Sequence, residues 1–113
     1  MTLREIINQK LELVRNQPDM PPALADQVST ELSAILGSLS DREAELRQKA
    51  YRIAVDAIES DKPIGFAEML MKSSESYADY KKAEGLYKSV LEVIRSLRAK
   101  VRRAEIEYKD NIS

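Results

Sequence analysis

The chain has 113 residues, of which 43% are hydrophobic and 33% charged, a balance typical of one folded domain rather than a disordered segment. It contains no Cys and no His, which excludes disulfides, thiol nucleophiles, cysteine metal sites and histidine as general base or metal ligand. The net charge is −1, but the charges are unevenly distributed along the chain. Residues 1–80 contain 9 basic and 14 acidic side chains, whereas residues 81–109 contain 9 basic and 4 acidic ones. We therefore expect a non-enzymatic protein with no cofactor, no metal and no small-molecule substrate.

A capping box marks the start of the first helix. Thr2 is followed three residues later by Glu5, and apolar residues then recur at helical spacing. This pattern predicts a helix over 3–15. Prolines crowd the next segment and predict a stiff connector. A second helix is then predicted over 21–36, ending at Gly37 because glycine is favoured just past a helix end.

A third helix is predicted over 41–59, because Ser40 and Glu43 form a second capping box. Its inward-facing residues are expected to be Leu46, Ala50, Ile53, Ala54, Ala57 and Ile58. A turn should follow over 60–65. The last helix is predicted over 66–109. No proline interrupts that range, so one continuous helix is favoured over a short helix that leads into a long one near Ser73 and Ser74.

The last helix carries a heptad seam, in which apolar residues alternate at spacings of three and four. Its members are Tyr80, Ala83, Tyr87, Val90, Ile94, Leu97, Val101, Ala104 and Tyr108. Bulky residues beside alanines do not suit a parallel two-stranded zipper. Leu86, Leu91 and Val93 widen the apolar face, which indicates more than one neighbouring helix.

The sequence therefore predicts an all-α fold, a bundle of about four helices forming a single domain over 1–113. The third and fourth helices should pair as an antiparallel hairpin with a coiled-coil-like seam. The third helix is too short to cover the whole seam, so we expect a homo-oligomer. The predicted interface residues are Tyr80, Tyr87, Val90, Ile94, Leu97, Val101, Ala104 and Tyr108.

Basic residues form a second row on the last helix, several of them seven residues apart. The candidates for contact with nucleic-acid phosphates are Lys81, Lys88, Arg95, Arg98, Arg102, Arg103 and Lys109. The alternative is a solvated helix face, since Glu84 precedes Lys88 by four residues and such pairs stabilise an exposed helix. The isoelectric point of about 5.6 argues against a dedicated DNA-binding domain.

Three segments of the last helix carry a resemblance to a group of known proteins. They read Lys-Ala-Glu-Gly-Leu-Tyr over 82–87, Val-Ile-Arg-Ser-Leu-Arg over 93–98 and Glu-Ile-Glu-Tyr over 105–108. This pattern resembles small, uncharacterised all-helical proteins from phage early or replication regions. The resemblance implies a phage or prophage origin and a non-enzymatic accessory role, and it transfers no functional residues.

Three functional hypotheses follow. The first is a self-associating helical protein that binds an unidentified protein partner through the exposed part of the seam. The second is an accessory nucleic-acid-binding protein in recombination or replication, which uses the basic row. The third is a phage inhibitor of a host factor, in which the acidic first half mimics a polyanion. We expect no membrane association and a cytoplasmic location, that of the host if the chain is phage-encoded, because the apolar runs are shorter than a membrane span and the start lacks a signal sequence.

Overall fold

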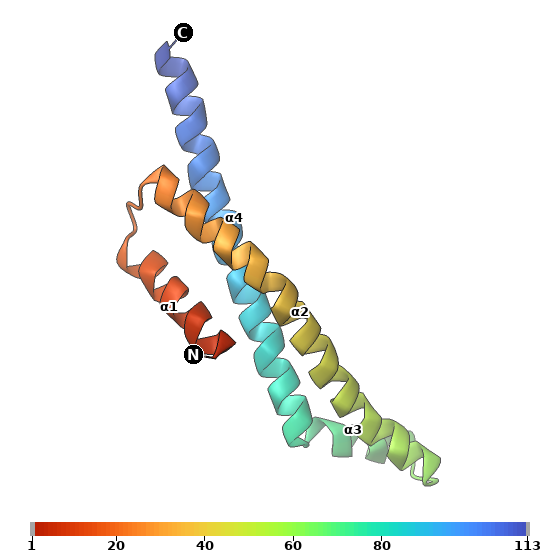
Figure 1. Cartoon of the computed structure of the whole chain (residues 1–113). Helices are drawn as coiled ribbons and strands as arrows, with labels where there is room; N and C mark the ends of the chain where they lie inside the picture. The colour runs from red at the N-terminus through yellow and green to blue at the C-terminus, as the bar shows by residue number, and fades with distance from the viewer. Residues whose placement is uncertain (1, 113) are drawn as a thin grey trace. The chain divides into compact units, whose positions relative to one another are not determined.

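The computed structural model describes residues 2–112, and over this range the chain forms four α-helices and no strand. The helices are α1 (Leu3–Asn16), α2 (Pro22–Glu59), α3 (Ile64–Lys72) and α4 (Glu75–Ile112). The long C-terminal helix α4 packs mainly against α2 (Figure 1). The predicted all-α fold with a long last helix is therefore confirmed, although the predicted break after residue 36 is absent and the last predicted helix is divided near Ser73.

The predicted start of α1 is confirmed by its cap. The Thr2 side chain accepts a hydrogen bond from the backbone N–H of Glu5, at 3.2 Å between Oγ1 and N. This bond satisfies one of the N–H groups that a helix start leaves unpaired. The helix ends at Asn16, one residue later than predicted.

The predicted helix end at Gly37 and restart at Ser40 are wrong, because α2 runs unbroken through both residues. Gly37 does not adopt a positive φ, so it does not form the left-handed cap that the sequence suggested. A glycine inside a helix costs only about 1 kcal/mol relative to alanine. Burial of Leu32 before it and Leu39 after it offsets that cost.

The favoured continuous helix over 66–109 is also wrong, and the alternative with a short first helix matches the structure. Two serine hydroxyls bond to the backbone at the break, as serines do when they compete with helical hydrogen bonding. Ser73 donates to the carbonyl of Leu70 at 3.1 Å, and Ser74 donates to that of Met71 at 2.6 Å. Ser74 also accepts from the N–H of Tyr77 at 3.2 Å, which caps the first turn of α4.

The predicted turn after α2 is present and has the geometry of a Schellman motif. The N–H of Lys62 bonds to the carbonyl of Ala57, and the N–H of Asp61 bonds to that of Ile58, both at 3.0 Å. Asp61 has a φ of 62°, a left-handed conformation that aspartate tolerates better than most residues. This motif closes α2 and leads directly into α3.

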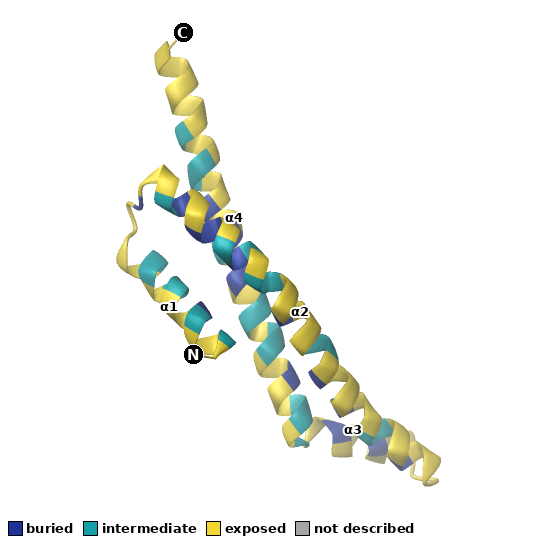
Figure 2. Cartoon of the chain, viewed as in Figure 1, coloured by how far each residue is buried: buried dark blue, intermediate teal, exposed yellow. Residues whose placement is uncertain are grey.

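The chain divides into two compact units. Unit 1 comprises Met1–Gly37 and Lys88–Ser113, and unit 2 comprises Ser38–Tyr87. In unit 1, α1 and the first part of α2 pack with the second part of α4, and burial is concentrated where these helices meet (Figure 2). The buried apolar residues of unit 1 are Ile7, Met20, Ala25, Val28, Leu32, Val90, Ile94 and Leu97.

Polar contacts link the elements of unit 1. Lys10 of α1 forms an ion pair with Glu31 of α2. The Arg98 guanidinium of α4 donates to the Ser33 hydroxyl at 2.9 Å. Lys100 donates to the carbonyl of Pro18 at 2.6 Å. These bonds fix the helices in register, whereas the apolar core provides most of the stabilisation.

The ion pair between α1 and α2 predicts an acid-sensitive contribution to stability. The pKa of Glu31 lies below its usual value of 4.5, because Lys10 and Gln27 donate hydrogen bonds to the carboxylate. A depressed folded-state pKa stabilises the fold above pH 4.5 and loses that effect as the pH falls through the folded pKa. The melting temperature of Glu31→Gln should therefore lie below wild type at pH 7, and the difference should shrink as the pH falls below 4.5. Glu12→Gln, an exposed substitution on α1, serves as the control and should change little over the same pH range.

In unit 2, the second part of α2 runs antiparallel to the first part of α4, with α3 at one end (Figure 1). Its buried residues are Leu39, Leu46, Ala50, Ala57, Ala67, Met71 and Tyr80. Ile58 was predicted to face inward, but 47% of its surface is exposed. Its neighbour Ala57, also predicted to face inward, is buried, and the next residue of a helix points about 100° away.

Candidate interaction surface

The centre of the predicted interface seam is buried by the chain itself. Val90, Ile94 and Leu97 are at most 1% exposed, and Tyr80 is also buried. Tyr87, Val101 and Ala104 are half-buried. Only Tyr108 among the predicted interface residues is exposed. The seam therefore forms intramolecular core along most of its length and leaves Tyr108 accessible to a partner.

Large apolar side chains are instead exposed on α3. This helix reads Ile-Gly-Phe-Ala-Glu-Met-Leu-Met-Lys, and its buried members are Ala67 and Met71. The exposed ones include Ile64 at 67% and Met69 at 57%. A helix that is apolar on all sides is normally buried on all sides. Most of the large apolar side chains of α3 are therefore not covered by the rest of unit 2.

The last turns of α2 expose a second apolar row, at the same end of unit 2. Tyr51, Val55 and Ile58 follow at spacings of four and three, so they share one face of the helix. That face lies about 100° around α2 from the row buried against the rest of unit 2. We define the apolar surface as these residues together with the four exposed on α3, namely Tyr51, Val55, Ile58, Ile64, Phe66, Met69 and Leu70.

The outer face of α3 is hollowed. A depression of about 480 Å³ is lined by Gly65, Glu68, Met69, Lys72 and Ser73. The first four are spaced i, i+3, i+4 and i+7, which is the arrangement that receives one side chain of a facing helix in knobs-into-holes packing. A Cβ added at Gly65 would meet no atom within 4 Å. Position 65 is therefore open on its outer side.

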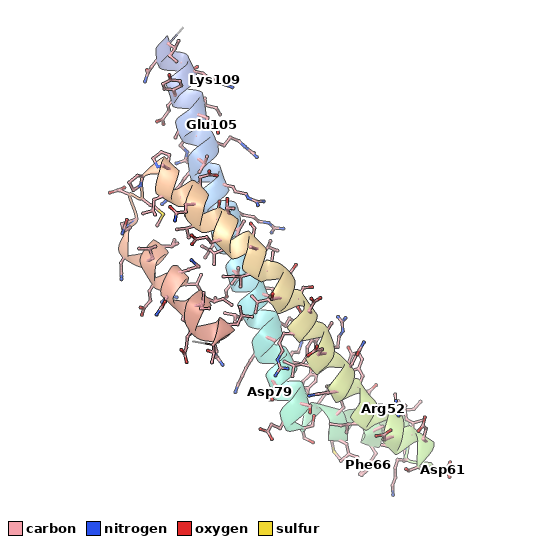
Figure 3. The ribbon with its side chains drawn as sticks, viewed as in Figure 1. Arg52, Asp61, Phe66, Asp79, Glu105 and Lys109 are labelled. Atoms are coloured by element: carbon pink, nitrogen blue, oxygen red, sulfur yellow. The ribbon has the colours of Figure 1, made fainter. Side chains whose placement is uncertain are left out.

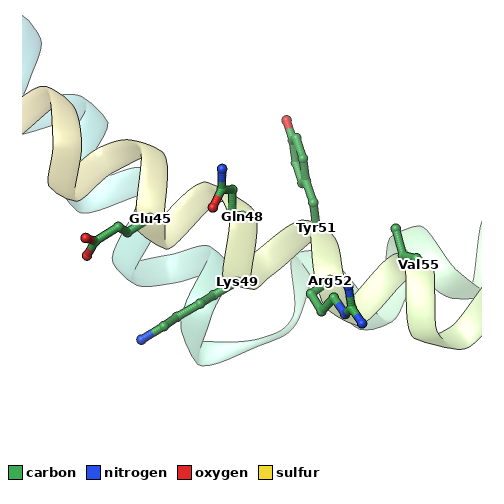
Figure 4. Close-up of a pocket in the computed structure, with 6 residues that line it drawn as sticks. All are labelled: Glu45, Gln48, Lys49, Tyr51, Arg52 and Val55. Atoms are coloured by element: carbon green, nitrogen blue, oxygen red, sulfur yellow. The ribbon is translucent and has the colours of Figure 1, made fainter.

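A second hollow, of about 580 Å³, lies along α2 (Figure 4). It is lined by Glu45, Gln48, Lys49, Tyr51, Arg52 and Val55. Every lining residue comes from one helix and four of the six are polar, so it is a surface depression rather than the enclosed apolar pocket typical of small-molecule sites. Tyr51 and Val55 belong both to this hollow and to the apolar surface, and the polar lining residues lie beside them.

Charged groups around the apolar surface are of both signs. The Lys62 ammonium lies over the Phe66 ring, 5.9 Å from its centroid, and Figure 3 shows Phe66 and Asp61 at the α3 end of unit 2. Arg52 pairs with Asp56 four residues on, at 3.3 Å. A mixed, neutralised rim around an apolar centre is the usual composition of a protein–protein interface.

A tyrosine cluster binds Lys81, the first of the predicted phosphate-binding residues. Its ammonium donates to Glu84 at 3.2 Å and lies within 6 Å of the Tyr77 and Tyr80 ring centroids. The Tyr80 hydroxyl donates to the same carboxylate at 2.9 Å, and this bond raises the pKa of Tyr80. The bond to Glu84 likewise raises the pKa of Lys81. Lys81 therefore takes part in the packing of unit 2.

The remaining predicted phosphate-binding residues divide into two groups. Arg98 is bonded to Ser33, and Lys88 and Lys109 also have interaction partners within the chain. Arg95, Arg102 and Arg103 are exposed and form no ion pair in the part of the chain that the structure describes. The structure thus leaves a smaller basic cluster on α4 than the sequence suggested.

Comparison with protein-family models, with curated proteins and with solved structures finds no match to this chain. Within residues 2–112 no group of three or more acidic, His or Cys side chains is arranged to hold a metal ion. Over the same residues, no helix combines the length and the apolar character needed to cross a membrane.

The exposed apolar residues of α2 and α3 do not follow the long heptad pattern of α4, so that pattern does not predict them. A signal was present in α3, where apolar residues occupy almost every position from Ile64 to Met71. Glu68 is the one charged residue in that range, so most of the helix surface is apolar. A segment of this composition indicates either a buried helix or a binding surface.

Proposed function

We propose that this chain is a non-enzymatic assembly protein that binds a protein partner through the apolar surface of unit 2. One observation carries the proposal: α3 buries only Ala67 and Met71 and leaves Ile64, Phe66, Met69 and Leu70 exposed. Together with Tyr51, Val55 and Ile58 of α2, these side chains expose roughly 500–600 Å² of apolar area. Exposure of that area to water is unfavourable, by about 25 cal/mol per Å², and a partner would relieve it.

The hollow beside Gly65 supports a helical partner in particular. Its four-residue spacing matches a knobs-into-holes acceptor, and the missing side chain lets a facing backbone approach closely. The absence of His and Cys from the sequence removes the residues on which most metal and nucleophilic catalysis depends, in keeping with a binding role.

Site-specific photocrosslinking in cells tests this proposal. A photoreactive amino acid at Met69 should give a covalent adduct with a protein, because this side chain stands on the exposed face of α3. The same amino acid at Ser40, an exposed position of α2 outside the apolar surface, is the matched control. Equal labelling at both positions, or no protein adduct at Met69, would contradict the proposal.

Nucleic-acid binding is a second candidate, supported by the exposure of Arg95, Arg102 and Arg103, which form no ion pair with any acidic residue among residues 2–112. Arg95 and Arg102 are seven residues apart and share a helix face. Reversing all three to Glu should abolish binding to labelled DNA or RNA in fluorescence anisotropy, and wild-type affinity should fall steeply between about 50 and 200 mM salt. Arg42→Glu with Arg47→Glu, two exposed changes on unit 2, is the control. No binding by wild type at low salt would rule the candidate out.

The phage origin, the accessory role in recombination or replication, the inhibition of a host factor and the host-cytoplasm location stay predictions from the sequence. The acidic character on which the inhibitor hypothesis depends is spread over both units. Two of these acidic residues form ion pairs within the chain: Glu31 pairs with Lys10, and Asp56 pairs with Arg52. These pairings reduce the charge available to mimic a polyanion.

A further inference from the structure

We propose that α1 is a detachable cover of unit 1, and that the face of α2 and α4 beneath it is a binding site for an amphipathic helix of another protein. This second site is independent of the apolar surface of unit 2. Three features support it: the weak attachment of α1, the pairing of α2 with α4 without help from α1, and the residue pattern that α1 presents to them.

Polar contacts identify the side of α2 that α1 covers. Glu31 pairs with Lys10 of α1, whereas Ser33 accepts a hydrogen bond from Arg98 of α4. Two residues along a helix are about 200° apart, so α1 and α4 pack on different sides of α2. The residues that share the side of Glu31, at spacings of four and seven, are Leu24, Val28 and Ile35.

α4 contributes a second row to the same site. Lys100 donates to the carbonyl of Pro18, in the connector that follows α1. Val93 and Leu97 precede Lys100 by seven and three residues, so they share its side of α4. We define the covered face as Leu24, Val28, Glu31 and Ile35 of α2 with Val93 and Leu97 of α4. Glu31 is its one charged residue.

α1 is attached more loosely than the helices that it covers. Among its fourteen residues only Ile7 is buried, and its other apolar side chains are half-buried (Figure 2). The side chains of Lys10 and Glu31 are 23% and 39% exposed, and ion pairs with such access to water contribute little. A helix of this length is marginal by itself, so α1 should open before the rest of unit 1.

The pairing of α2 with α4 does not require α1. Within unit 1 the bond between Arg98 and Ser33 joins the two helices directly. Both helices also continue into unit 2, where they run antiparallel (Figure 1). Departure of α1 therefore leaves the covered face in place and exposes its apolar side chains to water, which is unfavourable. A second helix that covers the same side chains removes that cost.

The sequence of α1 shows which kind of helix this face accepts. Large apolar residues recur along it at spacings of four, four and three, and Lys10 stands among them where it meets Glu31. A partner helix needs the same apolar row for affinity and a basic residue at the same place to fix its register. The row of α1 is Leu3, Ile7, Leu11 and Val14.

The connector over residues 17–21 favours a foreign helix over α1 of a second copy. A short connector keeps the chain's own α1 at a high effective concentration beside its site. An identical helix from a second copy has no contact to offset that advantage. Only a helix that binds more tightly than α1 displaces it, which requires a different protein.

Fluorescence anisotropy on the full-length chain, with a labelled synthetic peptide of residues 2–17 as probe, tests the inference. Ile7→Asp in the chain should release its own α1, because a carboxylate cannot occupy the buried position, and the peptide should then bind about tenfold or more tightly than to wild type. A peptide that itself carries Ile7→Asp should bind neither chain. Adding Glu31→Lys to the Ile7→Asp chain should weaken peptide binding about tenfold, and Lys10→Glu in the peptide should restore it to within about threefold.

Circular dichroism shows whether Ile7→Asp releases α1 alone. The variant should lose about one-seventh of the helical signal, which is the share of α1 among the four helices. In wild type, the amides around Ile7 should exchange with solvent about tenfold or more faster than those around Leu32 and Ile94. Loss of most helical signal, or equal exchange in all three places, would show that α1 is an inseparable part of the core and overturns the inference.

The remaining outcomes are also decisive. No peptide binding by the Ile7→Asp chain, or binding that ignores the exchange of charge between positions 10 and 31, overturns the site. A wild-type dimer in sedimentation velocity that Ile7→Asp abolishes would show that a second copy supplies the helix, against the assignment to another protein. None of these measurements depends on Met69, so the proposed function of the apolar surface is tested separately.

Discussion

Leu97→Asp should unfold unit 1 rather than merely separate two copies of the chain. Leu97 is 1% exposed and belongs to the core that joins the second part of α4 to α1 and α2. The substitution removes the apolar contacts of a buried leucine, which by itself costs about 3–5 kcal/mol, and adds a carboxyl group with no polar partner. A domain of this size has a total stability of about 5–15 kcal/mol. We therefore expect loss of most helical signal in circular dichroism at 25 °C, or a melting temperature lowered by 15 °C or more, on the order of 4 °C for each kcal/mol.

A matched control lies nine residues further along the same helix. Ile106 is 54% exposed, so Ile106→Asp should leave the melting temperature within about 2 °C of wild type, as surface substitutions usually do. A folded Leu97→Asp variant that had only lost self-association would mean that the seam joins two copies of the chain, as the sequence predicts, and is not intramolecular core.

Tyr80→Ala should have the largest effect on unit 2. Tyr80 is 8% exposed, and its ring meets Tyr51 and Tyr77 edge-on, with centroids 6.5 and 5.9 Å apart. Removal of a buried aromatic side chain typically costs about 3–5 kcal/mol, and edge-to-face pairs add to the area term. We expect the free energy of unfolding, measured by urea titration, to fall by about 3 kcal/mol.

Tyr80→Phe separates the ring from the hydroxyl. It keeps the aromatic contacts and loses only the bond to Glu84, so stability should fall by about 1 kcal/mol or less. Equal losses for Tyr80→Phe and Tyr80→Ala would show that the hydroxyl bond to Glu84 within α4, and not ring packing, accounts for the contribution of Tyr80 to stability. Tyr108→Ala, at a residue 68% exposed, should change stability little.

The elements of the fold that rest on local chemistry could be predicted from the sequence. The Thr2 cap, the proline connector and the turn after Glu59 each depend on a few adjacent residues. The all-α class follows from periodic patterns that need no knowledge of packing. Gly37 was misjudged because its preference for a helix end is worth about 1 kcal/mol, and burial on both sides of it outweighs that preference.

The sequence alone does not decide whether the helix continues through Ser73 and Ser74 or breaks there. No proline marks a break, and although serine is favoured at a helix N-cap, it also occurs inside helices with its hydroxyl bonded to a preceding carbonyl. The candidate site was less predictable still. Periodicity identifies which residues share a face, but whether the partner of that face is intramolecular depends on tertiary packing, as the burial of Val90, Ile94 and Leu97 shows.

The small contact area of α3 has a consequence for its dynamics. An isolated helix shorter than about 12–15 residues is marginal in water, and α3 has nine residues, two of them buried, with no side-chain cap at Pro63. Its backbone amides should therefore open locally, with hydrogen exchange much faster than that of the amides around Leu32 or Ile94. A partner that binds α3 has to order its backbone as well as cover its side chains. Slower hydrogen exchange of the α3 amides would therefore report partner binding, even if exchange elsewhere in the chain did not change.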